Sequence, residues 1–312
     1  MAKGEFAKMS CRGLSLMSGG LDSQLAVRVL ERAGAAVEAV AFASPPFFDA
    51  DRAVAAAKAL GVRLHVIDFF PDEAAILKAP PHGFGGAMNP CIDCHATMIR
   101  RAGELMARLG YDFVATGEVR GQRPMSQNAQ SLLTVEKASG LKGRLVRPLS
   151  AKFLEPTIPE LEGKLDREKL LDLSGRARDR QIALAAEFGI VDYPSPAGGC
   201  KLTEDAFGHR LRDLMEHEGF GDRSLIEMLS VGRRFRLPDG TGVILGRNAE
   251  ENARLAKCAG TVVAFDDVPG PTALVPAVKS EADLERVRGI VRAWSRGTTE
   301  ADRAPFKAWQ LT

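Results

Sequence analysis

The first 150 residues alternate short apolar segments with longer amphipathic ones. The short segments have the composition of β-strands, and the longer ones space their apolar residues as helices do, two of them ending at Gly34 and Gly61. Repeated strand–helix–strand units build a parallel sheet with helices on both faces. We therefore expect a doubly wound α/β domain, with strands at 13–17, 37–44, 62–69 and 111–117 and helices at 23–34, 49–61 and 91–110.

The pattern changes in the second half of the chain. Residues 160–190 are charged and read as helical, and residues 191–203 are rich in proline and glycine, as a loop or linker is. A hairpin signal, Asp239-Gly240, then separates two short apolar runs, and further strand and helix patterns follow it. These features predict two domains, an α/β domain at 1–200 and a smaller α+β domain at 201–312.

The stretch "MSGGLDS" follows the first predicted strand and opens the first predicted helix. Gly19 and Gly20 allow the backbone to turn sharply and to bring N–H groups close to a ligand. Ser18 and Ser23 add hydroxyl groups, and a helix N-terminus favours negative charge. A turn without a ligand is the alternative, but the combination favours an anion site, and neither the Walker nor the dinucleotide glycine pattern is present.

The same stretch resembles the PP-loop signature of the ATP pyrophosphatase superfamily, which has an adenine-nucleotide α-hydrolase fold. The resemblance implies that ATP is cleaved between its α- and β-phosphates, that a carbonyl oxygen is adenylated and that pyrophosphate is released. It also implies Mg²⁺ beside Asp22, which we expect to be catalytic. The ATP-binding residues implied by the resemblance are Ser18, Gly19, Gly20, Asp22, Ser23, Ala43, Ser44, Thr116 and Gly117.

Three of the five cysteines are placed where chemistry is plausible. Cys91 and Cys94 form a Cys-x-x-Cys pair at the start of a predicted helix, and Cys200 lies in a glycine-rich loop. A helix N-terminus lowers the pKa of a thiol, so we expect thiolates here. Such cysteines in a chain without secretory features are more often catalytic or metal-binding than disulfide-bonded.

"NPCIDC" and the later "ATG" are similar to segments of tRNA thiouridylases related to MnmA, ThiI and TtuA. Cys91 stands where MnmA has an aspartate, and Glu118 stands where it has a histidine. The resemblance implies that Cys91, Cys94 and Cys200 are catalytic and bind a [4Fe–4S] cluster with one iron free of protein ligands. A persulfide on Cys200 or Cys94, a zinc site and a purely structural role are the alternatives.

Basic residues gather in two places although the net charge is only +2. Near the "ATG" segment and on the predicted hairpin they suit RNA phosphates. The hairpin and its "GRN" turn also resemble the RNA-binding module of NFACT-type proteins. We expect these basic residues to contact tRNA: Arg120, Arg123, Arg233, Arg234 and Arg236.

Together these signals predict an ATP-dependent tRNA thiolase, with sulfur supplied by sulfide or a cysteine desulfurase. A PP-loop enzyme acting on a small molecule, and a non-catalytic RNA-binding or sulfur-relay protein, are the alternatives. No run of 18 apolar residues and no apolar signal core are present, so we expect a cytoplasmic protein without a membrane partner. The sequence gives no expectation for the oligomeric state.

Overall fold

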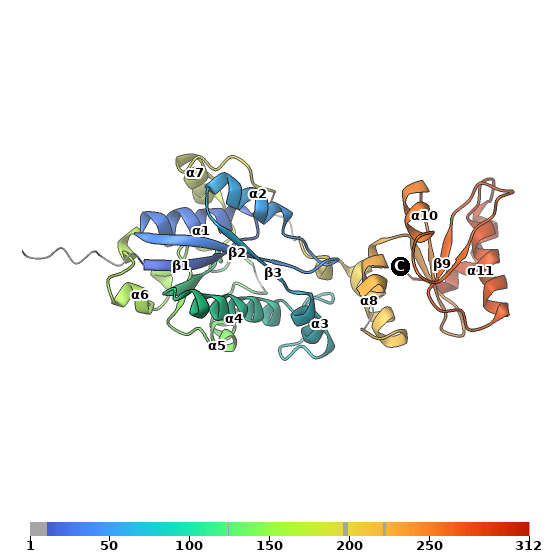
Figure 1. Cartoon of the computed structure of the whole chain (residues 1–312), viewed down its shortest axis with the longest axis horizontal. Coiled ribbons are helices and arrows are strands. Elements are labelled where there is room, and N and C mark those ends of the chain that lie inside the picture. Colours follow the sequence, from blue (N-terminus) through green and yellow to red (C-terminus); the bar gives the residue numbers. More distant parts are fainter. Residues whose placement is uncertain (1–10, 124, 196–198, 221–222, 312) are drawn as a thin grey trace, which may run out of the picture. The chain divides into compact units, whose positions relative to one another are not determined.

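A computed structural model of the chain describes residues 11–123, 125–195, 199–220 and 223–311. It divides into two compact units (Figure 1). The first unit comprises Met1–Gly85 and Asn89–Cys200, and the second comprises Gly86–Met88 and Lys201–Thr312. Three residues of the loop before Cys91 therefore belong to the second unit.

The first unit is built on a sheet of five parallel strands in the order β3-β2-β1-β4-β5. This confirms the predicted doubly wound fold, although the sequence pattern missed the short fifth strand. The strands are β1 (Cys11–Leu16), β2 (Ala35–Ala43), β3 (Leu64–Asp68), β4 (Phe113–Ala115) and β5 (Leu145–Val146).

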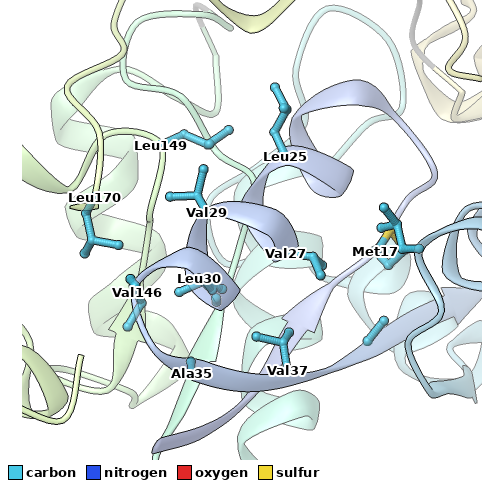
Figure 2. Close-up of a cluster of buried hydrophobic side chains, with 14 of the residues drawn as sticks. Met17, Leu25, Val27, Val29, Leu30, Ala35, Val37, Val146, Leu149 and Leu170 are labelled. Carbon is cyan, nitrogen blue, oxygen red and sulfur yellow. The ribbon is translucent and has the colours of Figure 1, made fainter. Parts of the chain in front are cut away.

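Helices cover both faces of this sheet (Figure 1). One face carries α1 (Leu21–Arg32), α2 (Asp51–Leu60) and α7 (Asp179–Glu187), and the other carries α3 (Phe70–Lys78), α4 (Cys91–Leu109) and α5 (Ala129–Ser139). Figure 2 shows how Val27 and Leu30 of α1 pack over Val37 of β2 and Val146 of β5. Their burial fixes α1 against this face of the sheet.

The strand order creates a switch point between β1 and β4. From β1 the chain moves outward to β2 and β3, and it then returns to the other side of β1 to form β4 and β5. The loops that follow β1 and β4 therefore diverge, and such a crevice is where α/β sheets bind ligands. The stretch at residues 17–23, which we call the phosphate loop, and the "ATG" segment at residues 115–117 both lie there.

Residues 160–190 do not form the continuous helical region that their composition suggested. The structure has short helices α6 (Ile158–Leu161) and η2 (Arg167–Lys169), an irregular stretch, and then α7. Gly163 and Gly175 adopt positive φ angles of 66° and 82°, which interrupt a helix. Backbone hydrogen bonds tie the irregular stretch to neighbouring loops instead.

The second unit is an antiparallel sheet in the order β10-β6-β7-β9-β8, covered by helices. The predicted hairpin is present, with Gly240 at φ 85° in its turn. Val287 and Ile290 of α11 pack on Phe235 of the sheet. The strands are β6 (Arg233–Arg236), β7 (Gly242–Leu245), β8 (Thr261–Val263), β9 (Ala273–Val275) and β10 (Gln310–Leu311). The α-helices are α8 (Asp205–His217), α9 (Arg223–Glu227), α10 (Ala249–Leu255), α11 (Glu281–Ala293) and α12 (Glu300–Arg303).

The remaining helical turns are η1 (Ala151–Phe153), η3 (Lys201–Thr203), η4 (Met228–Ser230) and η5 (Ala304–Trp309). Among the described residues, every helix is too short or too polar to cross a bilayer.

Candidate functional site

The loop after β1 has the geometry of an anion site. Gly19 has a φ of +79°, and a Cβ atom on it would lie 2.6 Å from the carbonyl oxygen of Arg52. Gly20 begins α1 without a side-chain cap, and Ser23 Oγ donates to the Gly20 carbonyl at 2.8 Å. No capping side chain covers the first N–H groups of α1 in this described segment, so they are open to a negatively charged ligand.

The loop after β4 packs directly on this anion site. A Cβ atom on Gly117 would lie 2.6 Å from the Asp22 carbonyl oxygen and 2.7 Å from Ser23 N, so only glycine permits the contact. Thr116 is buried beside it, and its Oγ1 donates to Glu118 at 3.0 Å. The structure therefore brings together the predicted residues of both loops.

Ala43 and Ser44 end the neighbouring strand β2. The Ala43 carbonyl accepts from Phe69 N at 2.7 Å, and Ser44, which is fully buried, donates its N–H to the Phe48 carbonyl at 3.0 Å. Both residues lie at the same edge of the sheet as the β1 and β4 loops.

The Glu118 carboxylate connects three elements of the first unit through hydrogen bonds and ion pairs. Arg147 Nε donates to Glu118 Oε2 at 2.8 Å, and His95 Nδ1 lies 3.1 Å from Oε1. Arg147 also donates to Glu136 of α5. Burial alone would raise the pKa of Glu118, but the Arg147 charge and the His95 hydrogen bond lower it to about 2. The carboxylate is therefore ionised at neutral pH and ties β4 to α4 and α5.

The three predicted cysteines share one neighbourhood of the first unit. Cys91 accepts a hydrogen bond from Asn89 Nδ2 at 3.2 Å, and Cys94 is only 8% exposed. The pKa of the Cys94 thiol is raised by burial and by the charges of Glu73, Cys200 and Cys91. Burial beside a carboxylate therefore opposes the thiolate that the helix N-terminus favours at Cys94.

Glu73 is a site residue that the sequence reasoning missed. It lies on α3, is fully buried, and its Oε1 is 3.9 Å from Cys94 Sγ. Burial raises its pKa to about 7, against hydrogen bonds from Ser44 and Cys94. The only sequence signal was an acidic residue within an apolar helical pattern.

Three thiols are suitable donors for an iron–sulfur cluster, but the ligand set is not assembled. Within the residues that the structure describes, no three His, Cys, Asp or Glu side chains are grouped so that they could hold a metal ion. The predicted cluster therefore rests on the chemistry of the three thiols and on their proximity.

Two further missed residues surround Asp22. Gln122 Nε2 donates to Asp22 Oδ2 at 2.8 Å. Burial raises the pKa of Asp22, whereas Gln122 and the nearby charges of Arg178 and Arg123 oppose that rise. Arg123, which we expected to contact RNA, therefore lies close to the anion site. The basic run "GRARDR" was the available signal for Arg178.

Two of the predicted RNA-binding arginines have side chains that are bonded to other residues of the second unit. Arg234 is 5% exposed and donates to the Leu225 carbonyl at 3.3 Å. Arg236 pairs with Asp213 and with Glu218, the latter at 2.6 Å. The structure thus contradicts their assignment to an RNA-binding surface, because both side chains point from β6 toward the helical layer that covers this face.

Arg233 points to the other face, and Arg247 lies near both Arg233 and Arg210 of α8. Arg210 and Arg247 donate to adjacent carbonyls, those of Leu229 at 3.1 Å and Ser230 at 3.2 Å. Burial and the charge of Arg247 lower the pKa of both Arg210 and Arg233. We call Arg210, Arg233 and Arg247 the arginine cluster.

Each unit is similar to a different known family. Residues 8–152 match the family described as thiamine biosynthesis protein (ThiI), and residues 232–306 match the NFACT protein RNA binding domain. Cys91 and Cys94 lie inside the first match, whereas Cys200 lies beyond it.

Two curated relatives resemble the first unit. A probable tRNA sulfurtransferase of Coxiella burnetii is 29% identical over 147 residues, which are 44% of this chain and 35% of the relative. One of Anoxybacillus flavithermus is 28% identical over 148 residues, 45% of this chain and 35% of the relative. The chain thus spans about a third of the length of these relatives.

Among solved structures, a 4-thiouridine synthetase in complex with RNA and ATP is similar, with 20% identity and a TM-score of 0.38 over 58% of this chain and 52% of that one. The two family matches lie in different units of the structure. The chain therefore combines a segment similar to the ThiI family, in its first unit, with a segment similar to the NFACT RNA-binding domain, in its second unit.

Proposed function

We propose that this chain is an ATP-dependent tRNA sulfurtransferase. The observation that carries the proposal is a continuous set of contacts from the phosphate loop to the cysteines. The backbone of Asp22 packs on Gly117, and the adjacent Thr116 donates a hydrogen bond to Glu118. Glu118 is in turn hydrogen-bonded to His95, the residue after Cys94. These contacts support the proposal that an activating site and a sulfur site are neighbours in the first unit. The curated relatives named as tRNA sulfurtransferases support the same activity.

The proposed reaction has two steps. A uridine carbonyl oxygen attacks the α-phosphorus of ATP, and the bond to the β-phosphate breaks with release of pyrophosphate. A sulfur nucleophile then attacks the activated carbon, and AMP leaves with the former carbonyl oxygen. Activation is needed because an oxygen bound to AMP is a far better leaving group than a carbonyl oxygen.

ATP and Mg²⁺ would be held at the switch point. Ser18, Gly19, Gly20 and Ser23 would bind phosphates through backbone N–H and hydroxyl groups, beside Ala43, Ser44, Thr116 and Gly117. Two buried oxygens, Asp22 Oδ1 and Gln122 Oε1, have no hydrogen-bond partner among the described residues. Such oxygens suit Mg²⁺, which prefers oxygen ligands and neutralises phosphate charge.

Sulfur would be delivered by Cys91, Cys94 and Cys200. When bound, a [4Fe–4S] cluster on these thiols would supply an open iron for sulfide. A persulfide on Cys200 or Cys94 is the competing form of the proposal. Sulfide would be the donor in the cluster form, and a cysteine desulfurase, which transfers sulfur at the persulfide level, would be the donor in the persulfide form.

tRNA would be bound by both units. Arg233 and Arg210, whose pKa values are both lowered by the charge of Arg247, would contact phosphates. Arg120 and Arg123, which follow the β4 loop, would do so in the first unit. We place this activity in the cytoplasm, where a tRNA substrate is available.

The test compares Cys91→Asp with Asp22→Ala on transcribed tRNA, which carries no thiolated base. Asp22→Ala should abolish pyrophosphate release without unfolding the chain, because Asp22 lies at a loop–helix junction. Cys91→Asp should retain pyrophosphate release but lose iron binding and most thiouridine formation, measured by nucleoside mass spectrometry. An iron-free Cys91→Asp protein that thiolates at the native rate would exclude the cluster form of the proposal. Undiminished pyrophosphate release by Asp22→Ala would exclude the proposed ATP site.

A further inference from the structure

Three buried polar atoms close to the phosphate loop lack a partner among the described residues. They are Asp22 Oδ1, Gln122 Oε1 and Arg178 Nε. A buried polar atom without a hydrogen bond destabilises the folded state, so native proteins contain few. Two oxygens and one guanidinium N–H without partners around Asp22 are complementary to a ligand that carries both a cation and an anion.

Backbone pairing holds the segment before Arg178 in place. Leu171 N and Leu173 N donate to the carbonyls of Pro148 and Leu149, each at 2.8 Å. Gly175 N then donates to the Arg120 carbonyl at 2.8 Å. The segment that carries Arg178 is therefore fastened to the loop that follows β4.

Arg178 stands at the junction between this segment and helix α7. It is the N-cap residue of α7, and its carbonyl accepts from Ile182 N at 2.9 Å. Helix α7 is packed into the core beside α1 through Ala185. Both sides of Arg178 are thus fixed, and its half-buried guanidinium is held near Asp22, whose pKa it lowers.

We propose that Arg178 is a catalytic residue that binds the pyrophosphate leaving group of ATP. The inference rests on the proposed function, which supplies the cleavage between the α- and β-phosphates. As the α-phosphorus bonds to the carbonyl oxygen, the electron pair of the broken bond leaves with the β-phosphate. A guanidinium already fixed at that place stabilises the growing charge without reorganising, and its planar fork matches two phosphate oxygens.

Arg180 provides a matched control on the same helix. It lies two residues further along α7, is exposed, and pairs with Asp172 at 2.6 Å. It carries the same charge as Arg178, but its guanidinium is already paired on the surface. A general loss of positive charge is therefore distinguishable from loss of the leaving-group contact.

The experiment measures pyrophosphate release on transcribed tRNA at saturating ATP, and pyrophosphate binding by calorimetry. Arg178→Ala should lower kcat by about 100-fold, the effect of removing one preorganised donor to developing charge, with a smaller change in the KM for ATP. It should also weaken pyrophosphate binding. Arg178→Lys should restore part of both quantities, and Arg180→Ala should leave both within about twofold, far below the loss of a buried contact.

Each outcome separates this inference from the proposed function. If folded Arg178→Ala and Arg178→Lys proteins release and bind pyrophosphate as the parent does, the assignment of Arg178 is wrong and the proposed function stands. If the parent protein forms no pyrophosphate from ATP, the proposed function fails first. If Arg178→Ala does not fold, as shown by a non-native circular dichroism spectrum, the folded Arg178→Lys protein gives the answer. Parental kinetics in Arg178→Lys would refute the role of Arg178, and a reduced kcat with a native spectrum would support it.

Discussion

At the residue scale, the departure from the thiouridylase pattern at Glu118 has a structural explanation. The position is filled by a buried carboxylate that neutralises Arg147, whose side chain is 1% exposed. Breaking a buried ion pair by removing one partner leaves the other charge without compensation. Glu118 is therefore expected to be among the most sensitive positions of the first unit.

We predict that Glu118→Gln lowers the free energy of unfolding by about 3 kcal/mol at pH 7. The folded-state pKa of about 2 lies below the ordinary value of 4.5, so the charged form contributes stability above pH 4.5. That contribution is lost as the pH falls from 4.5 to 2. Urea unfolding followed by circular dichroism should therefore show that the parent and variant converge in stability toward pH 2.

Glu104→Gln is the control for this prediction. Glu104 pairs with Arg100 and Arg101 on the exposed surface of α4, and such pairs contribute at most about 1 kcal/mol. Equal losses in Glu104→Gln and Glu118→Gln would show that the buried network does not stabilise the unit as described.

At the element scale, the alternation of side chains along strand β6 places its arginines on two faces of the sheet. Arg234 and Arg236 point to one face and are held by neighbouring elements, whereas Arg233 points to the other and joins the arginine cluster. A strand-like run of basic residues thus contains both structural and accessible guanidinium groups.

We predict that the double variant Arg210→Ala/Arg233→Ala binds tRNA about tenfold more weakly and lowers the slope of log affinity against log salt by about 1 to 2. The reason is that each lost phosphate contact reduces counterion release. Fluorescence anisotropy at several salt concentrations measures both quantities. Arg288→Ala, on the outer side of α11 and paired with Glu285, should change neither.

Arg236→Ala tests the structural part of this distinction. Its loss leaves Asp213 and Glu218 without their partner, so the second unit should become less stable. Unchanged tRNA affinity in the double variant would place the RNA contact outside the arginine cluster.

At the scale of the whole molecule, the loop before Cys91 connects the two units. Met88 is almost fully buried in the second unit, next to Gly208 of α8, and Arg212 Nη2 lies 3.5 Å from its sulfur. Asn89, the next residue, belongs to the first unit and bonds to Cys91. A fragment made of residues 201–312 would therefore lack part of its own core.

We predict that Met88→Ala lowers the unfolding free energy of the second unit by about 2–4 kcal/mol, as truncation of a buried methionine does. Both tryptophans, Trp294 and Trp309, lie in the second unit, so their fluorescence follows its unfolding selectively. Met125→Ala, at an exposed position of the first unit, should not move that transition. An unmoved tryptophan transition in Met88→Ala would show that the segment does not stabilise the second unit.

The sequence by itself determined the features that depend on neighbouring residues. Strand–helix alternation predicted the doubly wound sheet, and Asp239-Gly240 predicted the hairpin. The glycines of the phosphate loop predicted the turn into α1, because backbone freedom and side-chain periodicity are local properties. The local pattern failed at residues 160–190, which have a helical composition but do not form one helical region. Two glycines interrupt the helix there, and the backbone bonds to loops that are distant in the sequence.

The tertiary structure alone decided which charges are buried and which groups meet. It set Glu73 beside Cys94, held Arg178 near Asp22, and enclosed Arg234. These outcomes depend on packing between segments far apart in the chain. Burial and neighbouring charges set the pKa and accessibility of a side chain, and neither follows from the residues adjacent to it in sequence.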